Sequence, residues 1–108
     1  MIGQLSPLAL RDWLHDTSRP PPLLLDVREP WEYERCRIGD SQLLPLGKLA
    51  QRCDELPRDR AIVVICHHGV RSQQAAHFLD SAGFAQTYNL SGGVAAWAEQ
   101  VEPAMPRY

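Results

Sequence analysis

The sequence has few cysteines, and their spacing fits neither a disulfide framework nor a metal site. Only three of the 108 residues are cysteine, at positions 36, 53 and 66. An odd number, without a C-x-x-C pair or a second cluster at zinc spacing, predicts neither a disulfide scaffold nor a structural metal. At least one thiol is therefore expected to be free.

Long apolar runs are also missing. The longest, from Ala61 to Cys66, is far too short to span a membrane. The first residues, MIGQLSPLALRDWL, lack the basic start, the unbroken apolar stretch and the cleavage site of a secretory signal. We therefore expect a cytoplasmic protein that does not act at a membrane.

An excess of charge of one sign is absent as well. The 11 Lys and Arg residues nearly balance the 13 Asp and Glu residues, for a net charge of −2. Arginines spread along the chain form no basic face, which argues against nucleic acid as the main partner. The length suits one compact domain and not two, so we predict a single domain over residues 1–108 with one site.

Strand and helix patterns alternate along the chain. The clearest strand is Ala61–Ile65, which is apolar and β-branched, and the unbroken apolar character of Leu23–Val27 is typical of a strand buried on both faces. SQLLPL and QTYNL are shorter candidates, and the SGG that follows reads as a turn. Helices are expected from Pro7 to Asp16 after an N-cap at Ser6, near Pro30, over Leu46–Cys53, from an N-cap at Ser72 to Gly83, and over Val94–Val101.

Helical spacing also predicts which side chains are buried. One stripe would hold Leu46, Leu49, Ala50 and Cys53, and another would hold Ala75, Phe78, Leu79 and Ala82. The three tryptophans, Trp13, Trp31 and Trp97, are expected to lie in or partly in the core. Strands alternating with helices predict an α/β fold with a parallel sheet covered on both faces, whose site lies beyond the carboxyl ends of the strands.

Cys66 stands at such a strand end, in the stretch VVICHHGVRSQQAA. A tight loop that turns its backbone N–H groups inward, followed by a helix N-terminus, stabilises a thiolate or a bound oxyanion. Gly69 supplies the permissive backbone for the turn, and Arg71 adds positive charge. We interpret Cys66 as a nucleophile, with a buried structural cysteine as the alternative.

The loop CHHGVRS resembles the active-site loop of the rhodanese sulfurtransferases, C-x-x-G-x-R-[ST]. LLLDVREPWEYERCRIGDSQLLPL is similar to the amino-terminal signature of that family, and YNLSGGVAAW resembles its carboxyl-terminal signature. The three segments occur in the family's order. The resemblance implies a three-layer α/β fold, with a central, mostly parallel sheet of about five strands and helices on both faces.

Two features depart from related patterns. In the turn within the amino-terminal signature, Cys36 and Arg37 replace the family's Gly-His pair, and residues 39–41 differ as well, which puts a role of this turn in substrate entry in doubt. Four residues separate Cys66 from Arg71, whereas the related phosphatases and arsenate reductases have five. A shorter loop encloses a smaller space, which favours sulfur transfer over phosphoester hydrolysis.

The resemblance implies a persulfide mechanism at Cys66, with a donor such as thiosulfate and with cyanide, a thiol or a protein cysteine as acceptor. It requires no metal or organic cofactor. Arg71 would attract the oxyanion of the donor. The persulfide would be held by the backbone amides of the substrate-binding loop, namely His67, His68, Gly69, Val70, Arg71 and Ser72.

Several residues near the loop have two interpretations. By resemblance Asp26 and Arg28 border the pocket, but a salt bridge that ties the loop after their strand is the favoured role. His67 and His68 either transfer protons or line the pocket entrance; consecutive residues on a tight loop are expected to point apart, and a metal site with Cys66 is disfavoured. Cys36 either resolves the persulfide or is an exposed, unpaired thiol, which is the favoured reading.

Two further functions stay open from the sequence. The chain could be a sulfur relay or binding module that acts only with a protein partner, or a phosphatase or arsenate reductase of the same fold. A relay needs the same loop as a thiosulfate enzyme, whereas the presence of Cys66 with Arg71 argues against a module that only binds. The loop length argues against a phosphatase or arsenate reductase.

Overall fold

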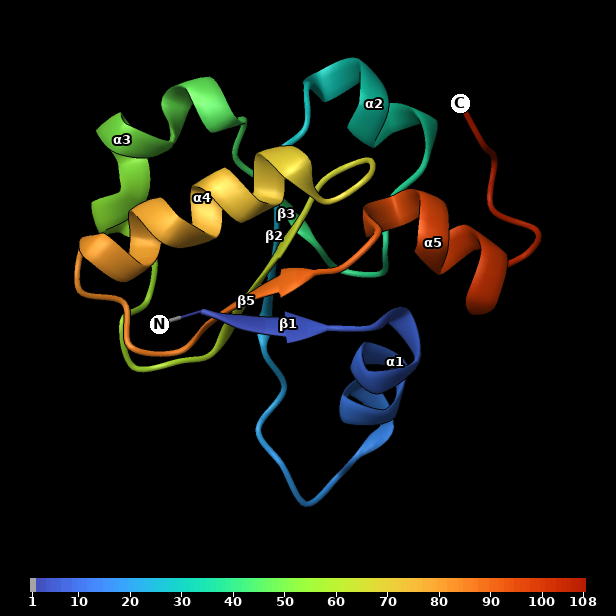
Figure 1. The fold of residues 1–108 in the computed structure, drawn as a ribbon, viewed down its shortest axis with the longest axis horizontal. Helices are drawn as coiled ribbons and strands as arrows, with labels where there is room; N and C mark the ends of the chain where they lie inside the picture. Colours follow the sequence, from blue (N-terminus) through green and yellow to red (C-terminus); the bar gives the residue numbers. More distant parts are fainter. Residues whose placement is uncertain (1) are drawn as a thin grey trace.

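The protein forms one five-stranded sheet in which all paired strands are parallel, in the order β1-β5-β4-β2-β3 (Figure 1). The structure, a computed structural model, describes residues 2–108. The strands are β1 (Gly3–Leu5), β2 (Leu23–Asp26), β3 (Gln42–Leu43), β4 (Ile62–Ile65) and β5 (Thr87–Leu90). The helices are α1 (Pro7–His15), α2 (Pro30–Arg35), α3 (Leu49–Arg52), α4 (Val70–Ser81) and α5 (Gly93–Gln100).

Helices cover both faces of the sheet, which confirms the predicted three-layer α/β fold. In Figure 1, α1 and α5 lie on one side of the sheet, and α3 and α4 lie on the other. Successive residues of β4 point to opposite faces, so Val63 and Ile65 enter the first core while Ile62 and Val64 enter the second. All four are fully buried, as a continuous apolar strand at the centre of a parallel sheet should be.

The strand register brings the predicted site residues together at one edge. Asp26 of β2 lies beside Ile65 of β4, so the chains that leave these two strands start next to each other. The loop after β4 carries Cys66, and the segment after β2 carries Arg28 and leads into α2. The predicted site residues therefore lie together at the carboxyl ends of the strands, as expected for an open parallel sheet.

Two elements differ from the sequence prediction. Strand β1, which pairs with β5, was not predicted, because three residues are too few to show a period. The helix predicted over Leu46–Cys53 is broken into a 3-10 turn, the single turn α3 and a second 3-10 turn, with Gly47 weakening its start. Ala50 is exposed there, whereas Cys53 is buried as predicted.

Helix α4 also begins earlier than predicted. Its N-cap is Gly69, with a φ of +104°, so Ser72 lies inside the first turn instead of capping it. The buried stripe is Ser72, Ala75, Ala76 and Leu79, spaced i, i+3, i+4 and i+7. Phe78 lies off that stripe and is 39% exposed, so its predicted burial is wrong.

Trp31 is a further correction. It is 60% exposed on α2, where it packs edge-on against the ring of Tyr108, whereas Trp13 and Trp97 are buried as predicted. Among residues 2–108, no helix has both the length and the apolar character needed to cross a bilayer.

Candidate active site

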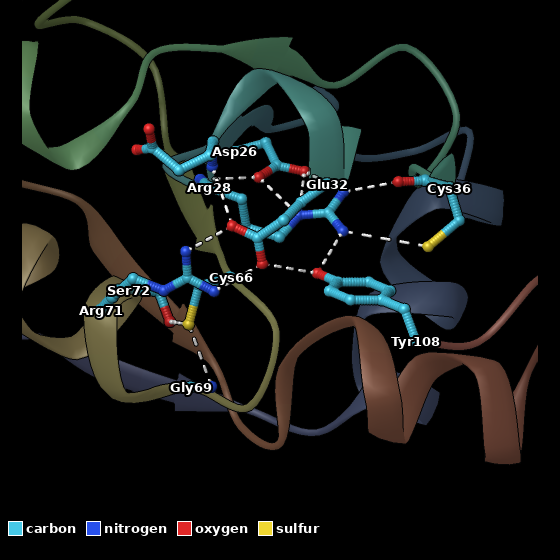
Figure 2. A network of polar contacts seen from close by, with 10 residues as sticks. Asp26, Arg28, Glu32, Cys36, Cys66, Gly69, Arg71, Ser72 and Tyr108 are labelled. Carbon is cyan, nitrogen blue, oxygen red and sulfur yellow. Dashed lines mark hydrogen bonds and ion pairs between the residues drawn. The ribbon is translucent and has the colours of Figure 1, made fainter. Parts of the chain in front are cut away.

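Cys66 lies at the end of β4 with 1% of its surface exposed. Its Sγ accepts a hydrogen bond from the Gly69 backbone N–H at 3.0 Å, and lies 3.2 Å from the Ser72 Oγ (Figure 2). The left-handed backbone of Gly69 turns the chain back so that its amide faces the sulfur. Since α4 starts at the next residue, the sulfur also lies close to free amides of a helix N-terminus.

The start of α5 holds the other side of this loop. The backbone N–H of Val94 donates to the Cys66 carbonyl at 2.8 Å, and that of Ala95 donates to the His67 carbonyl at 3.0 Å. Gly93 makes this approach possible, because a Cβ there would lie 2.4 Å from the Cys66 carbonyl oxygen. The SGG segment, predicted only as a turn, therefore also holds the loop that carries Cys66 in place. In the sequence, the second glycine of SGG is the feature that indicates this role.

Ser72 is held in position by a series of side-chain hydrogen bonds that runs from Ser72 through Asn89 to Gln4. The Ser72 hydroxyl donates to Asn89 Oδ1 on β5, and Asn89 Nδ2 donates to Gln4 Oε1 at 3.0 Å, which fixes the orientation of the amide. With its proton on the Asn89 side, the Ser72 oxygen accepts from a protonated Cys66 thiol. When Cys66 ionises, the same hydroxyl can rotate and donate to the thiolate. Sequence reasoning did not single out Asn89.

Arg71 does not point freely into solvent. Its two terminal nitrogens contact the two carboxylate oxygens of Glu32 on α2, at 2.6 and 2.8 Å. Hydrogen bonds from Arg71 lower the pKa of Glu32 to about 2, against the opposing effect of burial. The sequence showed Glu32 only as an acidic residue in a first helical turn, so this pairing across 39 residues was not predicted.

Asp26 and Arg28 form a buried ion pair, with neither side chain exposed. Every guanidinium N–H group of Arg28 has an acceptor: both Asp26 oxygens, the Cys36 carbonyl at 2.6 Å, the Tyr108 hydroxyl at 2.8 Å and, weakly, the Cys36 sulfur at 3.9 Å. Burial alone would lower the pKa of Arg28, but the hydrogen bonds to Asp26 and Tyr108 hold it above its ordinary value. This is the predicted salt bridge; a role at the pocket border stays a prediction.

Tyr108 joins these two ion pairs. Its hydroxyl accepts from Arg28 and donates to Glu32 Oε2 at 2.9 Å, as Figure 2 shows. Burial raises its pKa to about 12, so the phenol keeps its proton. Its ring stacks on His67 with the centroids 3.9 Å apart. The tail after α5 has no periodic pattern, so the sequence carried no signal for this position.

The two histidines stack on each other, with ring centroids 4.0 Å apart, so the expectation that they point apart is wrong. Burial and the neighbouring His68 lower the pKa of His67 below its ordinary value. Both rings line a cleft of about 460 Å³ that continues along α5 and the tail, past Ala95, Glu99 and Tyr108. Val70 lies on the outer side of the loop, 69% exposed.

Cys36 is buried, with 7% of its surface exposed, so the prediction of an exposed thiol is wrong. The guanidinium of Arg28 covers it, which explains the burial. All three cysteines are free thiols. Within residues 2–108, no group of three or more His, Cys, Asp or Glu side chains is arranged to hold a metal ion.

Comparison with known proteins points to one family. The model of the rhodanese-like domain matches residues 6–100. A probable adenylyltransferase/sulfurtransferase, MoeZ, of Mycobacterium tuberculosis is 40% identical over 106 residues, which cover 96% of this chain but 26% of that protein. The chain thus spans about a quarter of this relative's length.

Two further proteins match over nearly their whole length. A sulfurtransferase of Allochromatium vinosum is 36% identical over 103 residues, which cover 95% of this chain and 94% of that protein. The crystal structure of a rhodanese-related protein from Thermoplasma volcanium superposes with a TM-score of 0.83 at 31% identity, covering 94% of this chain and 95% of the other.

Proposed function

Because this chain belongs to the rhodanese-like domain family, we propose that it is a sulfurtransferase that moves a sulfane sulfur from a donor such as thiosulfate to a thiophilic acceptor through a persulfide on Cys66. The observation that carries this proposal is the position of the Cys66 sulfur, 3.0 Å from the Gly69 amide at the start of α4. An anionic sulfur is stabilised there by backbone groups, without any charged side chain.

In the first half-reaction the Cys66 thiolate attacks the outer sulfur of thiosulfate. A new S–S bond forms, and the bond between the two donor sulfurs breaks with its electron pair leaving on sulfite. The enzyme now carries an anionic persulfide, Cys–S–S⁻, whose outer sulfur takes over the negative charge. The amides of the loop 67–72 and the helix dipole of α4 favour that charge without a side-chain base.

In the second half-reaction the acceptor attacks the outer sulfur of the persulfide. Cyanide leaves as thiocyanate, and a thiolate acceptor leaves as a persulfide; either way, the electron pair of the enzyme's S–S bond returns to Cys66 as thiolate. The cycle is ping-pong, because the donor product leaves before the acceptor reacts. It uses no metal or organic cofactor, and His67 and His68 line the cleft without moving a proton.

Intact-mass analysis tests the proposal. The wild type should gain one sulfur, about 32 Da, after thiosulfate and lose it with release of thiocyanate after cyanide, as a covalent intermediate requires. Cys66→Ser should show neither change, and Cys53→Ser, which alters another buried thiol, should behave as the wild type. A wild type that stays unmodified by thiosulfate would overturn the thiosulfate reaction, and loading by a partner protein would then be the function to examine.

A further inference from the structure

The charges next to Cys66 cancel in pairs. Asp26 pairs with Arg28, and Glu32 pairs with Arg71, so these four side chains contribute no net charge to the mouth of the loop. Arg71 is the arginine of the loop itself and keeps 34% of its side chain exposed, while Glu32 keeps 5%. A small anion that approaches Cys66 therefore meets a guanidinium that already holds a carboxylate with both of its terminal nitrogens.

Glu32 is fixed in this position by several contacts. Its carboxylate accepts from Arg71, from the Tyr108 hydroxyl at 2.9 Å and from the backbone N–H of Glu29 at 3.0 Å, the last as part of a capping box at the start of α2. A carboxylate held by three donors does not move aside as a single surface ion pair can. An anionic donor must then either break this pairing or bind beside it.

The arginine of this pair also belongs to the loop that holds the reacting sulfur. Although the hydrogen bonds to Glu32 are the main reason that the pKa of Arg71 is raised, the charge of the Cys66 thiolate contributes too. Arg71 and Cys66 belong to the same short loop, in which Ser72 contacts the sulfur directly. The net charge of the Glu32–Arg71 pair therefore contributes to the electrostatic potential at the Cys66 sulfur, where the donor must place its sulfane sulfur.

We propose that Glu32 is a specificity-determining residue: by occupying Arg71 it disfavours small anionic donors at Cys66 and favours donors with no charge beside the sulfane sulfur, such as the persulfide of a thiol or of a protein cysteine. This inference rests on the proposed sulfur transfer. Thiosulfate still reacts, but as a weak donor. A persulfide donor reacts in its protonated form, R–S–SH: the Cys66 thiolate attacks the outer sulfur, and the electron pair of the donor's S–S bond leaves on R–S⁻. This thiolate takes up the proton of the transferred sulfur, so that the anionic persulfide stays on Cys66.

Two alkylating reagents of nearly the same shape can measure, without any sulfur donor, how strongly Glu32 disfavours anions at Cys66. Iodoacetate is an anion and iodoacetamide is neutral, and both react with the same thiolate. The ratio of their rate constants at Cys66 therefore cancels any change in the amount of thiolate and reports the charge that the reagent meets. Alkylation is followed by intact mass, and Cys66→Ser gives the background from the two other thiols.

Glu32→Gln keeps the size of the side chain and an oxygen that can accept from Arg71, but removes the charge. The ratio of the iodoacetate rate to the iodoacetamide rate should rise roughly tenfold, the effect of one added charge interaction near a protein surface. Glu34→Gln makes the same charge change at an exposed position of the same helix and should leave the ratio unchanged. In steady state, Glu32→Gln should lower KM for thiosulfate more than it changes kcat.

A second variant keeps the test valid if Glu32→Gln folds poorly. Arg71→Gln leaves Glu32 without its cation, so the ratio should fall below that of the wild type. The double variant Glu32→Gln/Arg71→Gln should return it towards the wild-type value. An unchanged ratio in folded Glu32→Gln, or one that rises as much in Glu34→Gln, overturns the proposal. A ratio that moves as expected in a protein that thiosulfate never loads would uphold the role of Glu32 and refute thiosulfate as donor.

Discussion

Replacement of Arg28 by methionine should destabilise this protein more than any loss of a surface ion pair. The Arg28 side chain is fully buried, and it is the cation that faces the equally buried carboxylate of Asp26. Methionine fills much of the same volume but leaves this carboxylate without its partner. Removing one member of a buried pair costs about 3 to 5 kcal/mol, whereas an exposed pair contributes about 0 to 1 kcal/mol.

In a chain of 108 residues, each kcal/mol lowers Tm by about 4 °C, so Arg28→Met should lower it by roughly 12 to 20 °C. Scanning calorimetry at pH 7 measures this, with Arg52→Met, at the exposed pair with Glu55, as the matched control. The double variant Asp26→Leu/Arg28→Met removes both charges and should recover a large part of the loss. If it melts no higher than Arg28→Met, an unpaired carboxylate is not the cause and the reasoning is refuted.

Three other predictions concern the loop and its partners. Gly93→Ala should abolish persulfide loading and lower stability by about 2 kcal/mol or more, because its Cβ would overlap the Cys66 carbonyl. Gly47→Ala, where a Cβ meets nothing, should leave the mass shift unchanged and should not lower Tm. Ser72→Ala should slow loading by thiosulfate about tenfold, measured by stopped-time mass analysis, since one hydrogen bond to the sulfur is lost. Glu32, whose pKa is lowered from 4.5 to about 2, stabilises the fold above pH 4.5, and this stabilisation fades as the pH falls towards 2; acid unfolding should therefore be less steep over that range in Glu32→Gln than in the wild type.

The sheet and the position of Cys66 could be predicted because both rest on local patterns. A run of apolar, β-branched residues from Ile62 to Ile65 can be buried on both faces only at the centre of a parallel sheet, and the loop that leaves it must lie at the carboxyl edge. Gly69 marked the tight turn for the same reason, since its left-handed backbone is a local requirement.

The contacts of the site could not be predicted in this way, because they join residues far apart in the chain. Glu32 meets Arg71 across 39 positions, and Tyr108 meets Arg28 across 80, and neither pairing leaves a period or a spacing in the sequence. Burial of side chains near the carboxyl edge of the sheet likewise depends on contacts between residues that are far apart in the chain. Trp31 is exposed and Cys36 is buried, opposite to the predictions for both. Cys36 is covered by the Arg28 guanidinium, which comes from another segment of the chain.

The site separates two tasks, stabilisation of the sulfur anion and selection of the donor. Stabilisation of the sulfur anion comes from the Gly69 amide and the start of α4, neither of which depends on a charged side chain. Arg71 is engaged by Glu32, so a donor meets the net charge of this pair and not that of the guanidinium alone. Loss of Arg71 should therefore change which donors react while leaving the reactivity of Cys66 towards a neutral reagent nearly intact. An arrangement of this kind allows the choice of donor to vary through α2 without altering the loop that performs the chemistry.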